Sequence, residues 1–358
     1  MDCRVFPDEA VPRGDRQSPL FIVVLWLTFF LISMGLGYST LNRYDARNVP
    51  GLYDTRAYYA MVTDQPLQPD QVDLGHRVLV PFLARPIYHL AKDRIHTWNA
   101  ASFALLTVNS LFTSITALLI LLTGFQIAGA QRAAVLGSFV FLANFAVANL
   151  NLSGYVDSSV NCMLMAIVWS MIKSRWWLLP AFGVLGALSK ETFVPMCVIM
   201  VFTWWLVDGG ESNRRISRLI WIAAMTVATL ASLRLVMAWA HPAELPLAFA
   251  ASRRAESPGG YFGGLIRCLT AREFLFTFIW LLPLGVWRLK TLPKPWVAGA
   301  ASAGTAALAM GAYDDALGNA ARAMFSAVGP LLSLSAALLL SIPIQPEDQG
   351  IPRTREHG

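Results

Sequence analysis

The chain has 358 residues, of which 56% are hydrophobic and only 14% are charged, and its mean hydropathy is +0.51. Soluble globular proteins carry about 25% charged residues, so this composition excludes an ordinary soluble domain and indicates a lipid solvent. The net charge of +6 would suit nucleic acid. However, the basic residues form short clusters between apolar runs, where they report membrane topology, so we expect no nucleic-acid partner.

Long apolar runs dominate the chain. Runs of about 17–25 apolar residues are expected to cross a bilayer as helices, because hydrocarbon offers no partners for backbone N–H and C=O groups. We therefore predict an all-α fold, a polytopic transmembrane helical bundle that forms a single domain over residues 1–344, with a disordered cytoplasmic tail at 345–358. About ten runs, some of them short, are predicted spans: 19–40, 98–124, 134–150, 157–173, 176–189, 193–209, 218–240, 273–288, 296–312 and 323–343.

Residues 76–94 have a different pattern, inside a predicted first extracytoplasmic loop at 41–97. Their apolar residues recur at helical spacing, the other side is charged, and the stretch contains two prolines. We predict an amphipathic helix that lies along the membrane surface and does not cross it. With both termini cytoplasmic, the later basic clusters then fall on the inner side, as the positive-inside rule requires. These clusters are Arg132; Lys173 and Arg175; Arg214, Arg215 and Arg218; and Arg288, Lys290 and Lys294.

This topology places many charged residues on the outer face, several of them at span ends. Charges at such positions are costly unless they are paired or functional, so their convergence predicts a site that faces the outside. The residues are Asp45, Asp54, Arg56, His76, Arg77, Asp157, Lys190, Glu191, Asp314, Asp315 and Arg322.

The first outer loop offers a candidate catalytic carboxylate. Asp54 and Tyr58 are spaced i and i+4 in a short helical pattern, so both side chains can face one cleft. A carboxylate just above the bilayer suits a general base that takes a proton from an acceptor hydroxyl. The alternative is that Asp54 only caps a surface helix.

Basic residues at later span ends are candidate phosphate ligands. Gly183, Gly186 and Lys190 share one helix face, and a lysine at the outer boundary can bind phosphate as a point charge. The alternative is a snorkelling lysine paired with Glu191. Arg322 begins the last span and can clamp a phosphate bidentately.

Two alternatives apply to the remaining boundary charges. Arg322 would instead pair with Asp314 or Asp315 and close the preceding loop. Asp157, at the start of a span, would only complement the helix dipole.

Taken together, these motifs resemble the polytopic glycosyltransferases of the GT-C superfamily. The likeness covers most of the chain in order and topology, through short motifs. One departure is Thr55-Arg56 after the aspartate, where such proteins often have Gly-Gln. The matching segments are Asp54-Thr-Arg-Ala-Tyr58-Tyr59, Arg77-Val-Leu-Val-Pro81, Lys190-Glu191, and Asn319 with Arg322.

The resemblance implies transfer of a sugar, with inversion, from a polyprenyl-phosphate donor to a glycan, lipid or protein acceptor on the extracytoplasmic face. It implies that Asp54 is catalytic and that Lys190, Arg322 and Arg77 hold the donor phosphate. It also implies a multi-pass protein of a bacterial inner (plasma) membrane. A divalent cation, Mg or Mn, is compatible with the acidic residues, although no spacing demands one. Further site candidates are Asp45, Tyr58, His76, Asp157, Glu191, Asp314 and Asp315.

Two other functions are compatible with a polytopic chain. A secondary transporter would show inverted repeats, broken helices and polar sites near the bilayer midplane. A non-enzymatic subunit of an envelope-assembly complex would need no converging outer charges. Because the charges collect at the outer boundary, the sequence favours the transferase.

Overall fold

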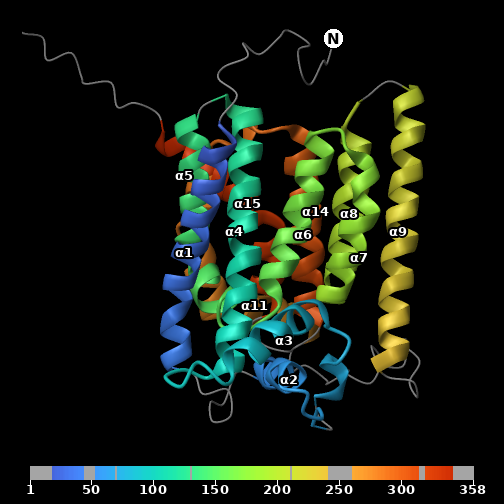
Figure 1. Cartoon of the computed structure of the whole chain (residues 1–358). Coiled ribbons are helices and arrows are strands. Elements are labelled where there is room, and N and C mark those ends of the chain that lie inside the picture. Colours follow the sequence, from blue (N-terminus) through green and yellow to red (C-terminus); the bar gives the residue numbers. More distant parts are fainter. Residues whose placement is uncertain are drawn as a thin grey trace, which may run out of the picture.

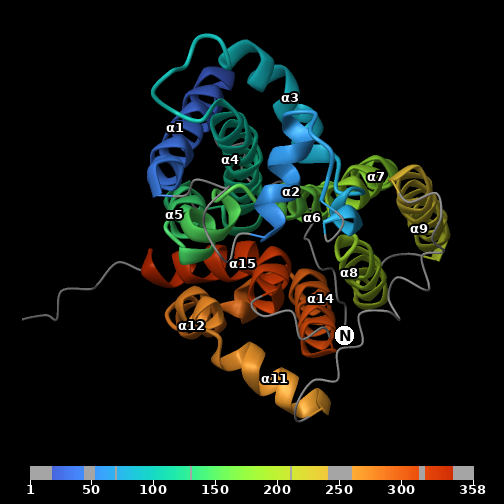
Figure 2. The same cartoon turned by 90° about the horizontal axis from the view of Figure 1, so that it is seen from below.

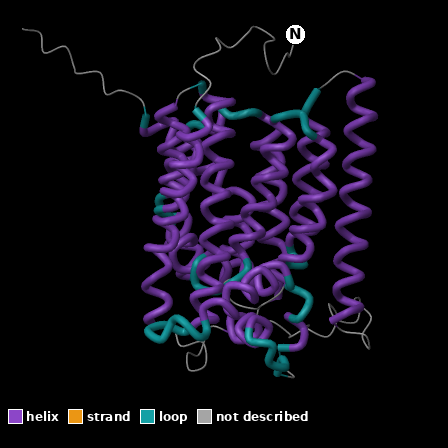
Figure 3. Tube along the Cα trace, in the orientation of Figure 1, coloured by secondary structure: helices purple, strands orange, loops and turns teal. Residues whose placement is uncertain are grey.

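The protein is a bundle of helices in a computed structural model that describes residues 18–43, 53–68, 71–129, 131–209, 212–240, 260–313 and 319–341. Helices account for most of these residues, and no strand occurs among them, which confirms the all-α prediction. Figure 3 shows helices along the body of the bundle and loops mainly at its two ends. The predicted tail at 345–358 lies outside the described residues.

Most of the helices run along one common axis (Figure 1). Helix α4 packs against α1, α5 and α6, α7 packs against α9, and α14 packs between α8 and α15. Three shorter helices, α11 to α13, lie on the outer side of α14 and α15 (Figure 2). The bounds are α1 (Pro19–Arg43), α4 (Ala100–Ala128), α5 (Gln131–Leu142), α6 (Asp157–Ile172), α7 (Leu179–Ser189), α8 (Phe193–Val207), α9 (Ser212–Ala240), α11 (Gly260–Thr270), α12 (Arg272–Phe278), α13 (Leu281–Trp287), α14 (Lys294–Tyr313) and α15 (Asn319–Leu340).

Several of these helices suit a membrane. Four described stretches are long and apolar enough to cross one: Pro19–Ser39, Ala100–Ile127, Arg215–Ala240 and Ala320–Leu340. Shorter apolar helices are Gln131–Leu142, Asp157–Ile172, Trp176–Ser189 and Phe193–Val207. A membrane protein is therefore supported, while the number of about ten spans stays a prediction.

Two predicted runs are not single helices. In the run 134–150, α5 ends at Leu142, and a π-helical turn follows at Val147–Asn151. Asn144 causes this break, because its Oδ1 accepts from the Ala146 N–H at 2.9 Å and its Nδ2 donates to the Thr277 carbonyl at 2.9 Å.

The run 273–288 is divided between α12 and α13. Pro283 lies in the first turn of α13, where the missing N–H of a proline is tolerated because it would have no helical partner. The chain therefore starts a new helix here and does not continue the preceding one.

Two helices lie across one end of the bundle, α2 (Tyr53–Val62) and α3 (Leu79–Ala91), with the 3₁₀ turn η1 (Val72–Leu74) between them (Figures 1 and 2). Helix α3 has 13 residues, so it is shorter than the predicted segment 76–94. It buries Val80 and Ala84 against the bundle and exposes Phe82, Leu83 and Leu90. This amphipathic arrangement suits a helix at a membrane surface.

The opposite end of the bundle carries the start of α1 and the end of α15 (Figure 1). The basic clusters after α6, at the start of α9 and between α13 and α14 adjoin helix ends on that same side. The basic clusters therefore lie at one end of the bundle and α2 and α3 lie at the other, as the sequence predicts. Their assignment to inner and outer membrane faces stays a prediction.

Candidate active site

A cluster of ionisable side chains lies where α2 and α3 cover the bundle, and we call it the charged cluster. Its members come from α2, the turn before α3, the start of α6, the turn between α7 and α8, and the start of α15. Ion pairs join them into one network, so segments far apart in the sequence meet at this end. The members are Asp54, His76, Arg77, Asp157, Lys190, Glu191 and Arg322.

Arg77 and Glu191 form one half of the charged cluster. Arg77 Nε donates to Glu191 Oε2 at 2.9 Å and Nη2 donates to Oε1 at 2.5 Å, a bidentate pair. His76 Nε2 lies 2.8 Å from Glu191 Oε2. Burial alone would raise the pKa of Glu191, but the Arg77 charge and the His76 hydrogen bond hold this pKa well below its usual value. Glu191 is therefore held as a carboxylate.

Asp157 organises the other half. Its side chain is 2% exposed and accepts from Lys190 Nζ at 3.1 Å and from Arg322 Nε at 2.8 Å, with a further contact from Arg322 Nη2. The Arg322 guanidinium also stacks 3.8 Å from the centre of the Tyr155 ring. Burial lowers the pKa of Lys190, while the Asp157 charge opposes that shift. Each buried charge here depends on its partner, because an unpaired one would bear the full desolvation penalty.

Asp54 links the two halves. Arg77 Nη1 donates to its Oδ2 at 3.2 Å, and Arg322 Nη2 lies 3.8 Å from the same oxygen. Arg77 Nη1 also donates to the Tyr58 hydroxyl at 3.0 Å, and burial raises the pKa of that phenol. Asp54 is 20% exposed, whereas both arginines are at least nine-tenths buried. It is thus an accessible carboxylate with longer ion-pair distances than Asp157 or Glu191.

The charges of the cluster balance. Three carboxylates face three permanent cations, so the formal sum without the histidine is zero. The carboxylates are Asp54, Asp157 and Glu191, and the cations are Arg77, Lys190 and Arg322.

Glycines at the end of α7 position the turn that carries Lys190 and Glu191. A Cβ on Gly186 would lie 2.1 Å from the Phe193 ring, so only glycine lets that ring fold over the helix end. A Cβ on Gly183 would meet Thr229 of α9 at 2.3 Å. The small-residue face predicted to lead to Lys190 is therefore a packing surface, of the kind that brings membrane helices close together.

The structure brings together most of the candidates predicted from the sequence. Asp54, His76, Arg77, Asp157, Lys190, Glu191 and Arg322 form the charged cluster, and Tyr58 contacts Arg77. Asp45, Asp314 and Asp315 lie outside the described residues.

The same contacts correct the alternatives for Lys190 and Asp157. Lys190 is 4% exposed and pairs with Asp157, so it is neither snorkelling nor paired with Glu191. Asp157 holds two cations directly, which is more than a complement to a helix dipole. Arg322 also pairs with Asp157, while Asp314 and Asp315, its alternative partners, lie outside the described residues and that alternative stays a prediction. No group of three His, Cys, Asp or Glu side chains in the described part of the chain is arranged for a metal, and the Mg or Mn expectation stays a prediction.

The sequence did not predict two features of the site. The first is Tyr155, whose stacking on Arg322 has only a weak sequence signal, its position two residues before Asp157.

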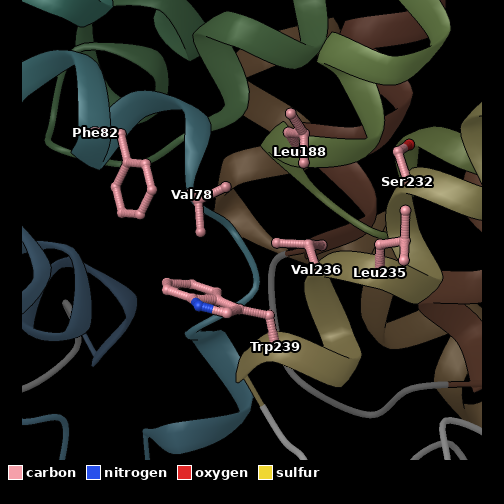
Figure 4. A pocket seen from close by; sticks show the side chains of 7 residues that line it. All are labelled: Val78, Phe82, Leu188, Ser232, Leu235, Val236 and Trp239. Carbon is pink, nitrogen blue, oxygen red and sulfur yellow. The ribbon is translucent and has the colours of Figure 1, made fainter.

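The second feature is an apolar pocket of about 380 Å³ between α3, α7 and α9 (Figure 4). It adjoins the charged cluster through Val78, which follows Arg77, and Leu188, two residues before Lys190. Its lining consists of Val78, Phe82, Leu188, Ser232, Leu235, Val236 and Trp239.

A comparison with known protein families finds no family model that matches the chain, and a search of curated proteins finds no similar sequence. The chemistry of the site itself therefore carries the functional argument.

Proposed function

We propose that the protein is a membrane glycosyltransferase that moves a sugar from a polyprenyl-phosphate donor to an acceptor on the extracytoplasmic face. One observation carries the proposal: the partly exposed carboxylate of Asp54 lies beside two buried arginines, at the end of an apolar bundle and next to an apolar pocket. A base, phosphate-binding cations and a lipid-compatible surface are thereby close together. A lipid-linked sugar phosphate needs all three.

The proposed reaction is a displacement at the anomeric carbon of the donor. The acceptor hydroxyl loses its proton to the Asp54 carboxylate while its oxygen forms a bond to the anomeric carbon. The bond from that carbon to the phosphate oxygen breaks, and the phosphate leaves with the electron pair. Attack opposite the leaving group inverts the anomeric centre. The buried cations stabilise the negative charge that develops on the phosphate.

The ion-pair distances suggest how the phosphate enters. Asp54 makes the longer contacts to Arg77 and Arg322, at 3.2 and 3.8 Å, whereas Glu191 and Asp157 hold the same arginines at shorter distances. A donor phosphate competes most easily with the weakest ligand. Binding would thus draw the arginines toward the phosphate and release Asp54 to accept a proton.

The apolar pocket accounts for the lipid part of the donor. Leu188, Val236 and Trp239 give it a hydrocarbon surface (Figure 4). Two of its lining residues, Val78 and Leu188, lie one and two positions from Arg77 and Lys190 in the sequence. Isoprenoid methylene and methyl groups gain roughly 25 cal/mol for each Å² removed from water. The polyprenyl chain would lie against these side chains while its phosphate meets the cations.

The place of the charged cluster favours a transferase over a transporter. It lies at the end of the bundle that carries α2 and α3 (Figure 1), whereas transporter sites form near the bilayer midplane. A scaffold subunit would have no use for a partly exposed carboxylate among buried arginines.

The direct test uses purified protein and a panel of radiolabelled polyprenyl-phosphate sugars, with transfer to an added acceptor extract measured by extraction and chromatography. Lys190→Ala should weaken donor binding, because a buried cation near the phosphate is lost. Lys290→Ala is the matched control, since Lys290 lies in the turn between α13 and α14. The proposal fails if no donor of the panel binds or reacts with well-folded protein. If Lys190→Ala binds the donor as tightly as the unchanged protein, Lys190 is not a ligand of the donor phosphate.

A further inference from the structure

A second pocket, of about 310 Å³, lies at the end of the bundle opposite the charged cluster. The turn after α6, the 3₁₀ turn η3 (Trp176–Leu178) and the first turns of α9 form its walls. None of its residues belongs to the proposed active site. They are Ser174, Trp176, Trp177, Ser217, Arg218 and Trp221.

Arg218 gives this pocket a positively charged wall. Its Nη1 donates to Asp208 Oδ2 at 2.5 Å, and its guanidinium carbon lies 5.1 Å from the centre of the Trp176 ring. The side chain remains 17% exposed. An arginine has five N–H donors, so an ion pair with one carboxylate leaves donors that can reach the pocket.

The segments that form the pocket carry more cations than the Asp208 carboxylate can balance. Lys173 and Arg175 flank Ser174 in the turn, and Arg215 lies one helical turn before Arg218. Burial and the Arg175 charge lower the pKa of Lys173, as expected where like charges are crowded. An anion is the chemistry that relieves this repulsion.

The other pocket walls suit a lipid more than a soluble anion. Trp177 is 60% exposed and Trp221 is 37% exposed, and tryptophans at helix ends settle at the headgroup level of a bilayer. The hydroxyls of Ser174 and Ser217 make no hydrogen bond to other described residues. The pocket therefore combines free hydroxyl donors, an arginine and large apolar rings.

We propose that this pocket binds the headgroup of an anionic phospholipid, with its phosphodiester on Arg218 and the two serine hydroxyls. The glycerol and the first acyl methylenes would lie against Trp177 and Trp221. Basic pockets between transmembrane helices recognise anionic headgroups in this way. The inference does not depend on the glycosyltransferase reaction, since it uses the other end of the molecule.

The test measures lipid binding to the full chain by native mass spectrometry, with dioleoylphosphatidylglycerol and dioleoylphosphatidylcholine titrated separately. Phosphatidylglycerol should bind at least tenfold more tightly. Arg218→Gln should remove about tenfold of that preference, because a charged hydrogen-bond donor is lost. Asp208→Asn should increase the preference, because it frees Arg218 for the phosphate. A merely structural ion pair would give no such opposite response.

Further variants keep the result decisive. Trp177→Ala removes an exposed ring with little risk to folding and should weaken phosphatidylglycerol binding several-fold. Lys290→Gln, a control at the same end, should leave it unchanged. Equal binding of both lipids, or unchanged preference in Arg218→Gln and Trp177→Ala, overturns the proposal. So does displacement of the lipid by an equal concentration of inorganic phosphate, which would assign the pocket to a soluble anion.

Discussion

Replacing Asp54 with asparagine should separate catalysis from folding at this site. Asp54 is 20% exposed, and its ion contacts are 3.2 and 3.8 Å long. Such a partly solvated pair stabilises a protein by up to about 1 kcal/mol, so the variant should stay folded. General-base assistance contributes about 10²–10⁴-fold in rate, or roughly 3–5 kcal/mol of activation free energy. The predicted loss of rate therefore greatly exceeds the loss of stability.

Asp157→Asn provides the opposite case. Asp157 is 2% exposed and holds both Lys190 and Arg322. Breaking a buried pair by removing one partner costs about 3–5 kcal/mol, because the remaining charge stays buried without compensation. This variant should lose folded protein as well as activity. Asp45→Asn, at a carboxylate closer to the first span in the sequence, should retain transfer.

The assay for these variants combines two measurements on purified protein. Size-exclusion profiles after stepwise heating report the folded fraction, and initial transfer rates at saturating labelled donor report turnover. Folded Asp54→Asn with near-normal turnover would refute the assignment of the base. An inactive Asp45→Asn beside an active Asp54→Asn would show that the wrong carboxylate was chosen.

Further predictions concern other parts of the molecule. Because the pKa of Glu191 is lowered in the folded protein, its ion pair stabilises the fold at pH values above the pKa of an unfolded glutamate, near 4.3. This stability is lost as the pH falls further, so heat stability should drop on acidification below about pH 4.5. Glu191→Gln should flatten that drop. Trp239→Ala enlarges the apolar pocket, so it should change the KM for long-chain donors more than the kcat, by raising the KM. If short-chain donors are affected equally, the pocket does not bind the lipid chain. Cysteines at Asp64 and Lys92, exposed positions that precede and follow α3 in the sequence, should react with an impermeant reagent from one side of the membrane. Labelling from opposite sides would mean that α3 crosses it.

The helical architecture could be predicted because apolar run length is a strong local signal. The break in the run 134–150 could not, since it depends on a tertiary contact, whereas the break in the run 273–288 has a local signal in Pro283. Asn144 ends α5 by bonding to Thr277, which lies 133 residues further along the chain. No pattern within 134–150 contains that partner.

The members of the charged cluster could be predicted, but their pairing could not. Charges at span ends are rare enough to stand out in an apolar sequence. Their partners are chosen by helix packing, and the sequence neighbours Lys190 and Glu191 end up in different halves of the cluster. Lys190 takes a partner 33 residues away, while Glu191 takes one 114 residues away.

The balance of charge within the cluster explains how it can be both stable and reactive. Without a partner, a buried lysine would lose its proton, and buried arginines, which stay charged, would bind adventitious anions, because desolvation opposes an isolated charge. Asp157 and Glu191 hold Lys190 and the arginines in their charged forms at short distances, and they are therefore positioning residues. Asp54 completes the balance at longer distances and with partial exposure, so its replacement by a phosphate costs the least. The same carboxylate therefore keeps the empty site neutral and becomes free to accept a proton when the donor arrives.

Lengthening the side chain in Asp54→Glu should bring the carboxylate closer to both arginines and strengthen its ion pairs with them. That variant should lower donor affinity while heat stability is kept or raised. Tighter donor binding by Asp54→Glu, measured by equilibrium binding of labelled donor, would show that the carboxylate does not compete with the phosphate.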